Sequence, residues 1–107
     1  MKNKLILALS GNDIFSGGGL HADLATYTVN GLHGFVAVTC LTAMTDKGFE
    51  VIPVEEEVFA QQLASLKDLP FSAIKIGLLP NLQIAEQALA FVKQHGDIPV
   101  VLDPVLV

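Results

Sequence analysis

The stretch LILALSGNDIFSGGGLHADL, residues 5–24, decides the fold. Its apolar start predicts a buried strand, and its end opens a helical pattern over residues 20–29. A glycine-rich loop between a strand and a helix is how α/β proteins present backbone N–H groups to a ligand. The consecutive glycines at 17–19 allow a close backbone approach that a side chain would prevent. Asp23 follows about one helical turn later, either as an exposed residue of a plain turn or as an acceptor for a ligand hydroxyl.

The rest of the chain alternates between apolar runs and helical patterns. Buried strands are expected at residues 33–41, 73–77 and 98–102, with a short extended segment at 49–54. Further helices are expected from the acidic residues 55–57 onward and over residues 84–92. This alternation predicts an α/β fold, with a parallel sheet, right-handed crossovers and helices on the sheet faces.

The composition excludes several classes of protein. Hydrophobic residues make up 51% and charged residues only 16% of the 107 residues, which suits an interior-rich sheet or a piece of a larger domain. The net charge is −5 and the six basic residues are scattered, so no nucleic-acid surface is expected. No stretch approaches the roughly 18 apolar residues of a membrane span, and no signal peptide is expected. The single cysteine, Cys40, is expected to be an inert core residue in a reducing, cytoplasmic setting.

The glycine loop fits neither of two common nucleotide-binding motifs well. The phosphate-binding pattern GxxxxGK[ST] does not occur. Gly17, Gly19 and Ala22 match a relaxed dinucleotide fingerprint, but the glycines begin well after the strand. No acidic residue closes a second strand about 20 positions later, where residues 39–42 lie. An NAD-dependent enzyme is therefore disfavoured.

A few polar residues outside the loop are candidates with two interpretations each. His21 stands beside the glycines, either solvated or lining a site. Asp103 ends a predicted strand, either as a turn residue or facing a ligand or metal ion. Lys75, within the apolar run 73–77, is more often a snorkelling residue on an edge strand than a catalytic amine. Met44 either packs in a loop or points into the crevice beside the glycine loop.

Four segments together resemble one family of kinases. Residues 11–24 are similar to its pattern G-S-D-x-S-G-G-A-G-I-Q-A-D-L, and residues 39–44 to T-x-L-T-A-Q. Residues 75–80 are similar to K-I-G-M-L-P, and residues 101–107 to V-x-D-P-V-M-V. The chain thus resembles the hydroxymethylpyrimidine kinase and pyridoxine/pyridoxal kinase branch of the ribokinase-like superfamily, from about residue 4 onward.

The resemblance implies a three-layer α/β sandwich with a mostly parallel central sheet. It implies transfer of the γ-phosphoryl group of ATP, with Mg²⁺, to a hydroxymethyl group on a small heteroaromatic ring. It also assigns roles to residues: substrate binding to Gly11, Asn12, Asp23, Met44, Leu78 and Val107, and the vicinity of phosphate and metal to Asp103.

The chain departs from the family pattern at three places and in its extent. Asn12 replaces a Ser, and residues 14–15 are Ile-Phe in place of Pro-Ser. Met44 stands where pyrimidine kinases carry a Gln that can pair with an aminopyrimidine edge, and Met also resembles the vitamin B6 kinases of Gram-positive bacteria. We therefore expect a B6 vitamer as substrate, with hydroxymethylpyrimidine as the alternative.

The family's nucleotide contacts and its anion-hole loop have no counterpart in residues 1–107. We expect these residues to be the N-terminal, substrate-binding part of a longer kinase, a homodimer when full length, with the catalytic residue beyond Val107. A non-catalytic α/β binding module is the other interpretation.

Overall fold

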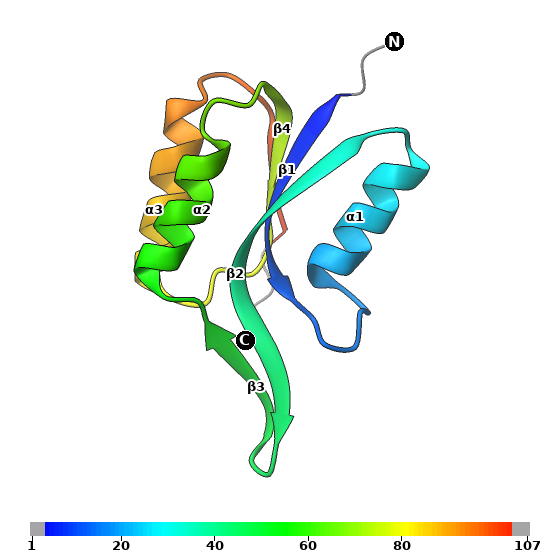
Figure 1. Cartoon of the computed structure of the whole chain (residues 1–107), viewed down its shortest axis with the longest axis vertical. Coiled ribbons are helices and arrows are strands. Elements are labelled where there is room, and N and C mark those ends of the chain that lie inside the picture. Colours follow the sequence, from blue (N-terminus) through cyan, green and yellow to red (C-terminus); the bar gives the residue numbers. More distant parts are fainter. Residues whose placement is uncertain (1–3, 104–107) are drawn as a thin grey trace.

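The computed structural model describes residues 4–103, which form a five-stranded sheet and three helices (Figure 1). In chain order, the elements are β1 (Leu5–Asn12), α1 (Gly19–Val29), β2 (His33–Thr45), β3 (Gly48–Pro53), α2 (Glu56–Leu66), β4 (Phe71–Ile76), α3 (Leu82–Gln94) and β5 (Val100–Leu102). None of the helices in this part of the chain is long and apolar enough to cross a membrane.

The sheet has the strand order β3-β2-β1-β4-β5. The central strand β1 is parallel to β2 on one side and to β4 on the other, and β5 continues the parallel arrangement beyond β4. Only β3 runs antiparallel, because a tight turn joins it to the end of β2. The chain therefore leaves β1 toward one edge and later returns to β1's other side. Such a switch point is where open α/β sheets bind ligands.

The helices cover the two faces of the sheet unequally. Figure 1 shows α2 and α3 side by side on one face and α1 alone on the other. The apolar core lies under α2 and α3, because β1 and β4 turn alternate residues toward them. Its fully buried members include Leu7, Leu9, Ile74, Phe59 and Ile84. Three layers result, with the dry core between the sheet and the helix pair.

Side-chain hydrogen bonds complete this frame where strands or helices leave backbone groups free. Gln62 on α2 accepts from the Val38 amide at 2.7 Å and donates to the Val38 carbonyl at 2.9 Å. It thus occupies the edge of β2 that β3, which pairs only with residues 40–45, does not reach. Asn81 caps α3 by accepting from the Ile84 amide at 2.9 Å, so this helix begins two residues before the predicted residue 84.

The predicted element order is confirmed, with two corrections. The second strand continues to Thr45 instead of ending at residue 41, because its last six residues pair with β3. The strand predicted at 98–102 is present, as β5, but the prediction that it is buried is wrong. All three residues of β5 are exposed, since β5 is the outer strand of the described sheet and Val101 and Leu102 are uncovered there.

Candidate active site

A cavity of about 370 Å³ lies at the carboxyl ends of β1, β4 and β5. Small-molecule sites commonly have this size and this place in a parallel sheet. Its lining comes from the end of β1, the glycine loop, the first turn of α1, the β2–β3 hairpin and the residues that follow β4 and β5. The cavity therefore sits at the switch point between β1 and β4.

The glycine loop is held in shape by Asp13. The two oxygens of its carboxylate accept from the Phe15 amide at 3.0 Å and from the Gly18 amide at 3.1 Å. Ser16 adopts a positive φ of 58° inside the turn, and Gly19 has φ +64° where α1 begins. This Asp-centred turn brings the start of α1 back against the end of β1.

Gly19 is the glycine that the loop requires most. A Cβ atom built there would lie 2.3 Å from the carbonyl oxygen of Gly11, whereas one at Gly17 would meet only the Asp13 carboxylate at 3.7 Å. The close approach predicted from the sequence therefore exists, and its partner is the protein's own β1 strand. A side chain at residue 19 would push the loop out of the cavity.

The floor of the cavity is the end of β1 against β2. The pairing of these strands shifts register between Ser10 and Asn12, and a Cβ at Gly11 would come within 2.5 Å of the Cys40 sulfur. Cys40 is fully buried, as predicted, and it also lines the cavity. Burial raises the pKa of its thiol and outweighs the opposing effect of the Thr39 hydroxyl, which lies 3.8 Å from the sulfur, so the neutral thiol is favoured.

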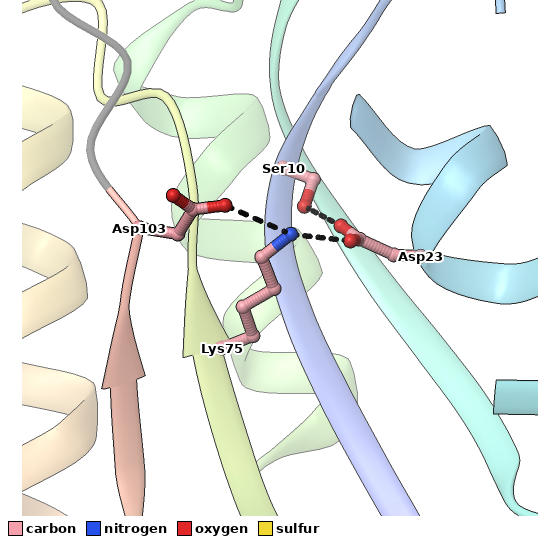
Figure 2. A network of polar contacts seen from close by, with 4 residues as sticks. All are labelled: Ser10, Asp23, Lys75 and Asp103. Carbon is pink, nitrogen blue, oxygen red and sulfur yellow. Dashed lines mark hydrogen bonds and ion pairs between the residues drawn. The ribbon is translucent and has the colours of Figure 1, made fainter. Parts of the chain in front are cut away.

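Four polar side chains meet on the α1 side of the cavity (Figure 2). Asp23 of α1 is buried; its Oδ2 accepts from the Ser10 hydroxyl at 2.6 Å, and its Oδ1 pairs with the ammonium of Lys75. The Lys75 Nζ also lies 3.7 Å from Oδ2 of Asp103, just past β5. Burial first, and the negative charge of Asp23 second, raise the pKa of Tyr27 to about 12. The network thus joins α1 to β1 and β4 through the Asp23 carboxylate, and Lys75 extends it to the end of β5.

An apolar wall faces this network from the hairpin and from the segment after β4. It consists of Phe49, Val51 and Leu78, and the carbonyl of Leu78 accepts from the Thr39 hydroxyl at 2.7 Å. Phe49 is half-exposed, and its ring centroid lies 6.2 Å from that of Phe15 in the glycine loop. The apolar wall and the polar network thus line the same cavity.

The structure brings together most of the residues expected in the site. Gly11, Asn12, Asp23, Leu78 and Asp103 all line the cavity. One expected member lies apart from them. Met44 is 58% exposed and does not line the cavity, although Thr42, on the same face of β2, does. Val107 lies outside the described residues.

Three further side chains of the site were not assigned from the sequence or were assigned differently. Ser10 and Asp13 are short polar residues in the quoted loop segment, and their hydrogen bonds depend on a fold that the sequence pattern does not give. The expectation that Lys75 snorkels on an edge strand is wrong, because β4 lies between β1 and β5. The signal was present: a lysine between two buried isoleucines of an inner strand needs a buried partner. His21 is exposed, outside the lining, with Nε2 2.9 Å from Oδ1 of Asn12.

Residues 4–103 do not form a metal centre by themselves. No group of three or more His, Cys, Asp or Glu side chains converges among them as a ligand set. Asp103, 69% exposed at its side chain, is a single carboxylate beside Lys75. Mg²⁺ commonly takes only one or two protein carboxylates together with substrate phosphates, so one such residue fits a shared site and not a dedicated one.

The sheet, the glycine loop and the cavity at the switch point define a ribokinase-like α/β protein. The chain belongs to the phosphomethylpyrimidine kinase family, whose sequence profile matches residues 13–107. A hydroxymethylpyrimidine/phosphomethylpyrimidine kinase of Haemophilus influenzae is 34% identical over 106 residues, covering 97% of this chain and 39% of that protein. A pyridoxine kinase of Bacillus subtilis is 33% identical over 105 residues, covering 94% and 39%.

Solved structures agree with this assignment. The pyridoxal kinase of Staphylococcus aureus in complex with pyridoxal superposes with a TM-score of 0.92 at 31% identity, over all of this chain and 41% of that one. The same enzyme has been solved with ADP, with a TM-score of 0.91 at 30% identity over 100% and 40%. The chain thus spans about two fifths of the length of the relatives it matches.

Proposed function

We propose that residues 1–107 are the acceptor-binding part of an ATP-dependent kinase that phosphorylates the hydroxymethyl group of a small heteroaromatic alcohol. The observation that carries the proposal is the buried carboxylate of Asp23, fixed through both oxygens at the side of a ring-sized cavity. An ionised carboxylate has about four acceptor positions, so two remain for a ligand after Ser10 and Lys75 are bound.

In this proposal each part of the cavity has a separate task. Leu78 and Phe49 hold the flat ring by apolar contact, and the hydroxymethyl group donates its O–H to Asp23. This hydrogen bond orients the alcohol oxygen for attack on the phosphoryl group. Phosphoryl transfer depends mainly on such positioning and on charge stabilisation at the phosphates, because the protein has little covalent chemistry to perform.

ATP and Mg²⁺ belong to the proposal as donor and cofactor. Relatives solved with ADP or with an ATP analogue support ATP as the donor. Asp103 would face the phosphates and the ion from the end of β5, on the side of Lys75 away from Asp23. The anion hole and the catalytic residue would come from a longer polypeptide, so we expect no phosphoryl transfer by residues 1–107 alone. A homodimer and a cytoplasmic location also stay predictions.

The substrate we favour is a B6 vitamer, pyridoxine, pyridoxal or pyridoxamine. The support is the apolar wall of the cavity, together with Met44, which lies outside the lining and whose thioether is a poor partner for an aminopyrimidine edge. Hydroxymethylpyrimidine is the second candidate, because relatives of both kinds match the chain with similar identity.

The test is an assay of the complete polypeptide that carries this chain. We expect ATP-dependent formation of the phosphate ester of pyridoxal, measured by mass spectrometry, with a lower kcat/KM for hydroxymethylpyrimidine. The Asp23→Asn variant should lose about 10–100-fold in kcat/KM, the equivalent of a hydrogen bond to a charged group. The exposed Asp97→Asn serves as the matched control and should leave activity unchanged.

Two results would count against the proposal. If the wild-type protein phosphorylates neither alcohol, the residues form a non-catalytic α/β module. If Asp23→Asn stays within about threefold of wild type, Asp23 has a structural role only.

A further inference from the structure

Lys75 is a charged residue in an unfavourable place for a charge. It stands on the inner strand β4, opposite Ala8 of β1 and Val101 of β5. Strand alternation turns it away from the core side taken by Ile74 and Ile76 and toward the cavity. Only 24% of its side chain is exposed, so its ammonium group needs charged or polar partners to offset the loss of water.

Two carboxylates supply these partners, and they differ in burial. The Asp23 side chain is 7% exposed and in direct contact with the Lys75 ammonium, whereas that of Asp103 is 69% exposed, at 3.7 Å. Exposed ion pairs contribute little, while a buried carboxylate left without its counter-charge is strongly unfavourable. The pair with Asp23 therefore carries most of the energetic weight.

Lys75 differs in charge from the other ionisable residues that line the cavity. Among the described residues that line it, Lys75 is the only cation, against the aspartates Asp13, Asp23 and Asp103. The Asp13 carboxylate is already hydrogen-bonded by loop amides, and the Lys75 ammonium pairs with Asp23 and Asp103. Figure 2 shows the Lys75 side chain between these two carboxylates, with the Ser10 hydroxyl beside the Lys75 ammonium and both directed toward Asp23.

We propose that Lys75 is a positioning residue for the acceptor alcohol. Its ammonium contacts one oxygen of Asp23 and the Ser10 hydroxyl donates to the other, so together they fix the plane of that carboxylate. A hydroxymethyl group in the cavity then meets an acceptor of fixed direction. This inference rests on the proposed function and extends it to a residue that acts through Asp23.

A purely structural role is the alternative that the test must separate. The ion pair joins α1 to β4 and could serve only to pin that helix onto the sheet. In that case, loss of the pair lowers stability, while the folded enzyme keeps its turnover. A positioning role predicts instead a kinetic defect in molecules that remain folded.

The experiment compares Lys75→Met and Lys75→Arg in the complete kinase, with the exposed Lys93→Met as matched control. We expect Lys75→Met to lower kcat about 10–100-fold, as for a lost charged hydrogen bond, with the KM for the alcohol changed less than about threefold. The apolar wall still holds the ring, so binding changes less than turnover. Lys75→Arg keeps the positive charge and should recover at least about tenfold of the loss.

The double variant Asp23→Asn/Lys75→Met removes both charges and keeps the side-chain sizes close. A positioning role predicts that its thermal stability returns toward wild type while kcat stays low. Recovery of both thermal stability and kcat in the double variant would overturn the inference. A Lys75→Met enzyme with wild-type kcat would also overturn it, and so would a folded Lys75→Arg enzyme whose kcat is no higher than that of Lys75→Met. A wild type that phosphorylates neither alcohol would overturn the proposed function and this inference together. If the wild type is active, the Lys75 variants test this inference alone.

Discussion

The two faces of the sheet are formed by the same strands but carry different kinds of side chain. Toward α2 and α3, β1 and β4 place Leu7, Leu9 and Ile74, all fully buried in an apolar core. Toward α1, the same strands place Ser10 and Lys75, which meet a buried aspartate beside the cavity. One residue of shift along a strand thus separates the face that holds the apolar core from the face that lines the cavity, which we propose to be the binding face.

This division has an energetic reason. Burial of apolar surface is non-directional and tolerates neighbours of many shapes, so one face can supply most of the stability. A buried charge network contributes less net stability than an apolar core of similar volume, but its geometry is specific. We therefore expect substitutions on the α2/α3 face to change stability first, and substitutions on the α1 face to change function first.

The largest expected effect is on the core face. Phe59→Ala removes a fully buried aromatic ring of α2 and should lower the free energy of unfolding by about 3–5 kcal/mol. Its neighbour Val58, 44% exposed, is the control, and Val58→Ala should cost less than about 0.5 kcal/mol. Denaturant unfolding of the complete polypeptide measures both. Equal costs for the two variants would show that α2 does not cover the core.

The next effect is on the loop that closes the binding face. Gly19→Ala forces a side chain into φ +64° and against the Gly11 carbonyl, so we expect a loss of about 2 kcal/mol or more in stability. The kcat/KM should fall with it, because the displaced loop lines the cavity. Gly17→Ala meets only an ordinary contact with Asp13 and should be close to wild type in both measurements. A reversed order would contradict the loop geometry.

How far the sequence predicts the molecule also differs between the two faces. Apolar periodicity predicted the strands and helices of the core face, because buried positions recur at regular intervals along a strand or a helix. The binding face was predicted in part: the glycine loop, Asp23 and Asp103 stand at strand ends and helix starts, which local patterns reveal. Lys75 was misjudged, since its role depends on which strands flank β4, and strand order is not a local property.

Met44 illustrates the same limit on the hairpin. Its place after an apolar run suggested a loop residue facing the crevice, but residues 40–45 pair with β3, and this pairing carries Met44 outward along the hairpin. Its distance from the cavity lining makes any contact with a ring substrate one at the rim. The substrate preference drawn from Met44 is therefore expected to be small.

The third prediction measures that preference. Met44→Gln should shift the ratio of kcat/KM for hydroxymethylpyrimidine over pyridoxal upward by about 2–10-fold, the range of one neutral hydrogen bond. Leu41→Gln is the matched control, because Leu41 is also exposed but lies on the other face of β2. An equal shift in both variants would assign the effect to hairpin polarity in general. A wild type that prefers the pyrimidine would contradict the B6 assignment itself.

The smallest expected effect concerns Tyr27, which connects α1 to the charge of Asp23. Its pKa of about 12 in the folded protein lies above the ordinary tyrosine value of 10.0. Between these values the unfolded state releases a proton that the folded state keeps, so stability should fall as pH rises through this window and level off above it. Tyr27 is only half-buried, and solvent screening keeps the change modest. The measurement is the difference in unfolding midpoint between wild type and Tyr27→Phe from pH 9 to pH 12. Parallel curves would mean that Tyr27 ionises alike in both states, and that the negative charge of Asp23 is confined to the pocket formed by Ser10 and Lys75.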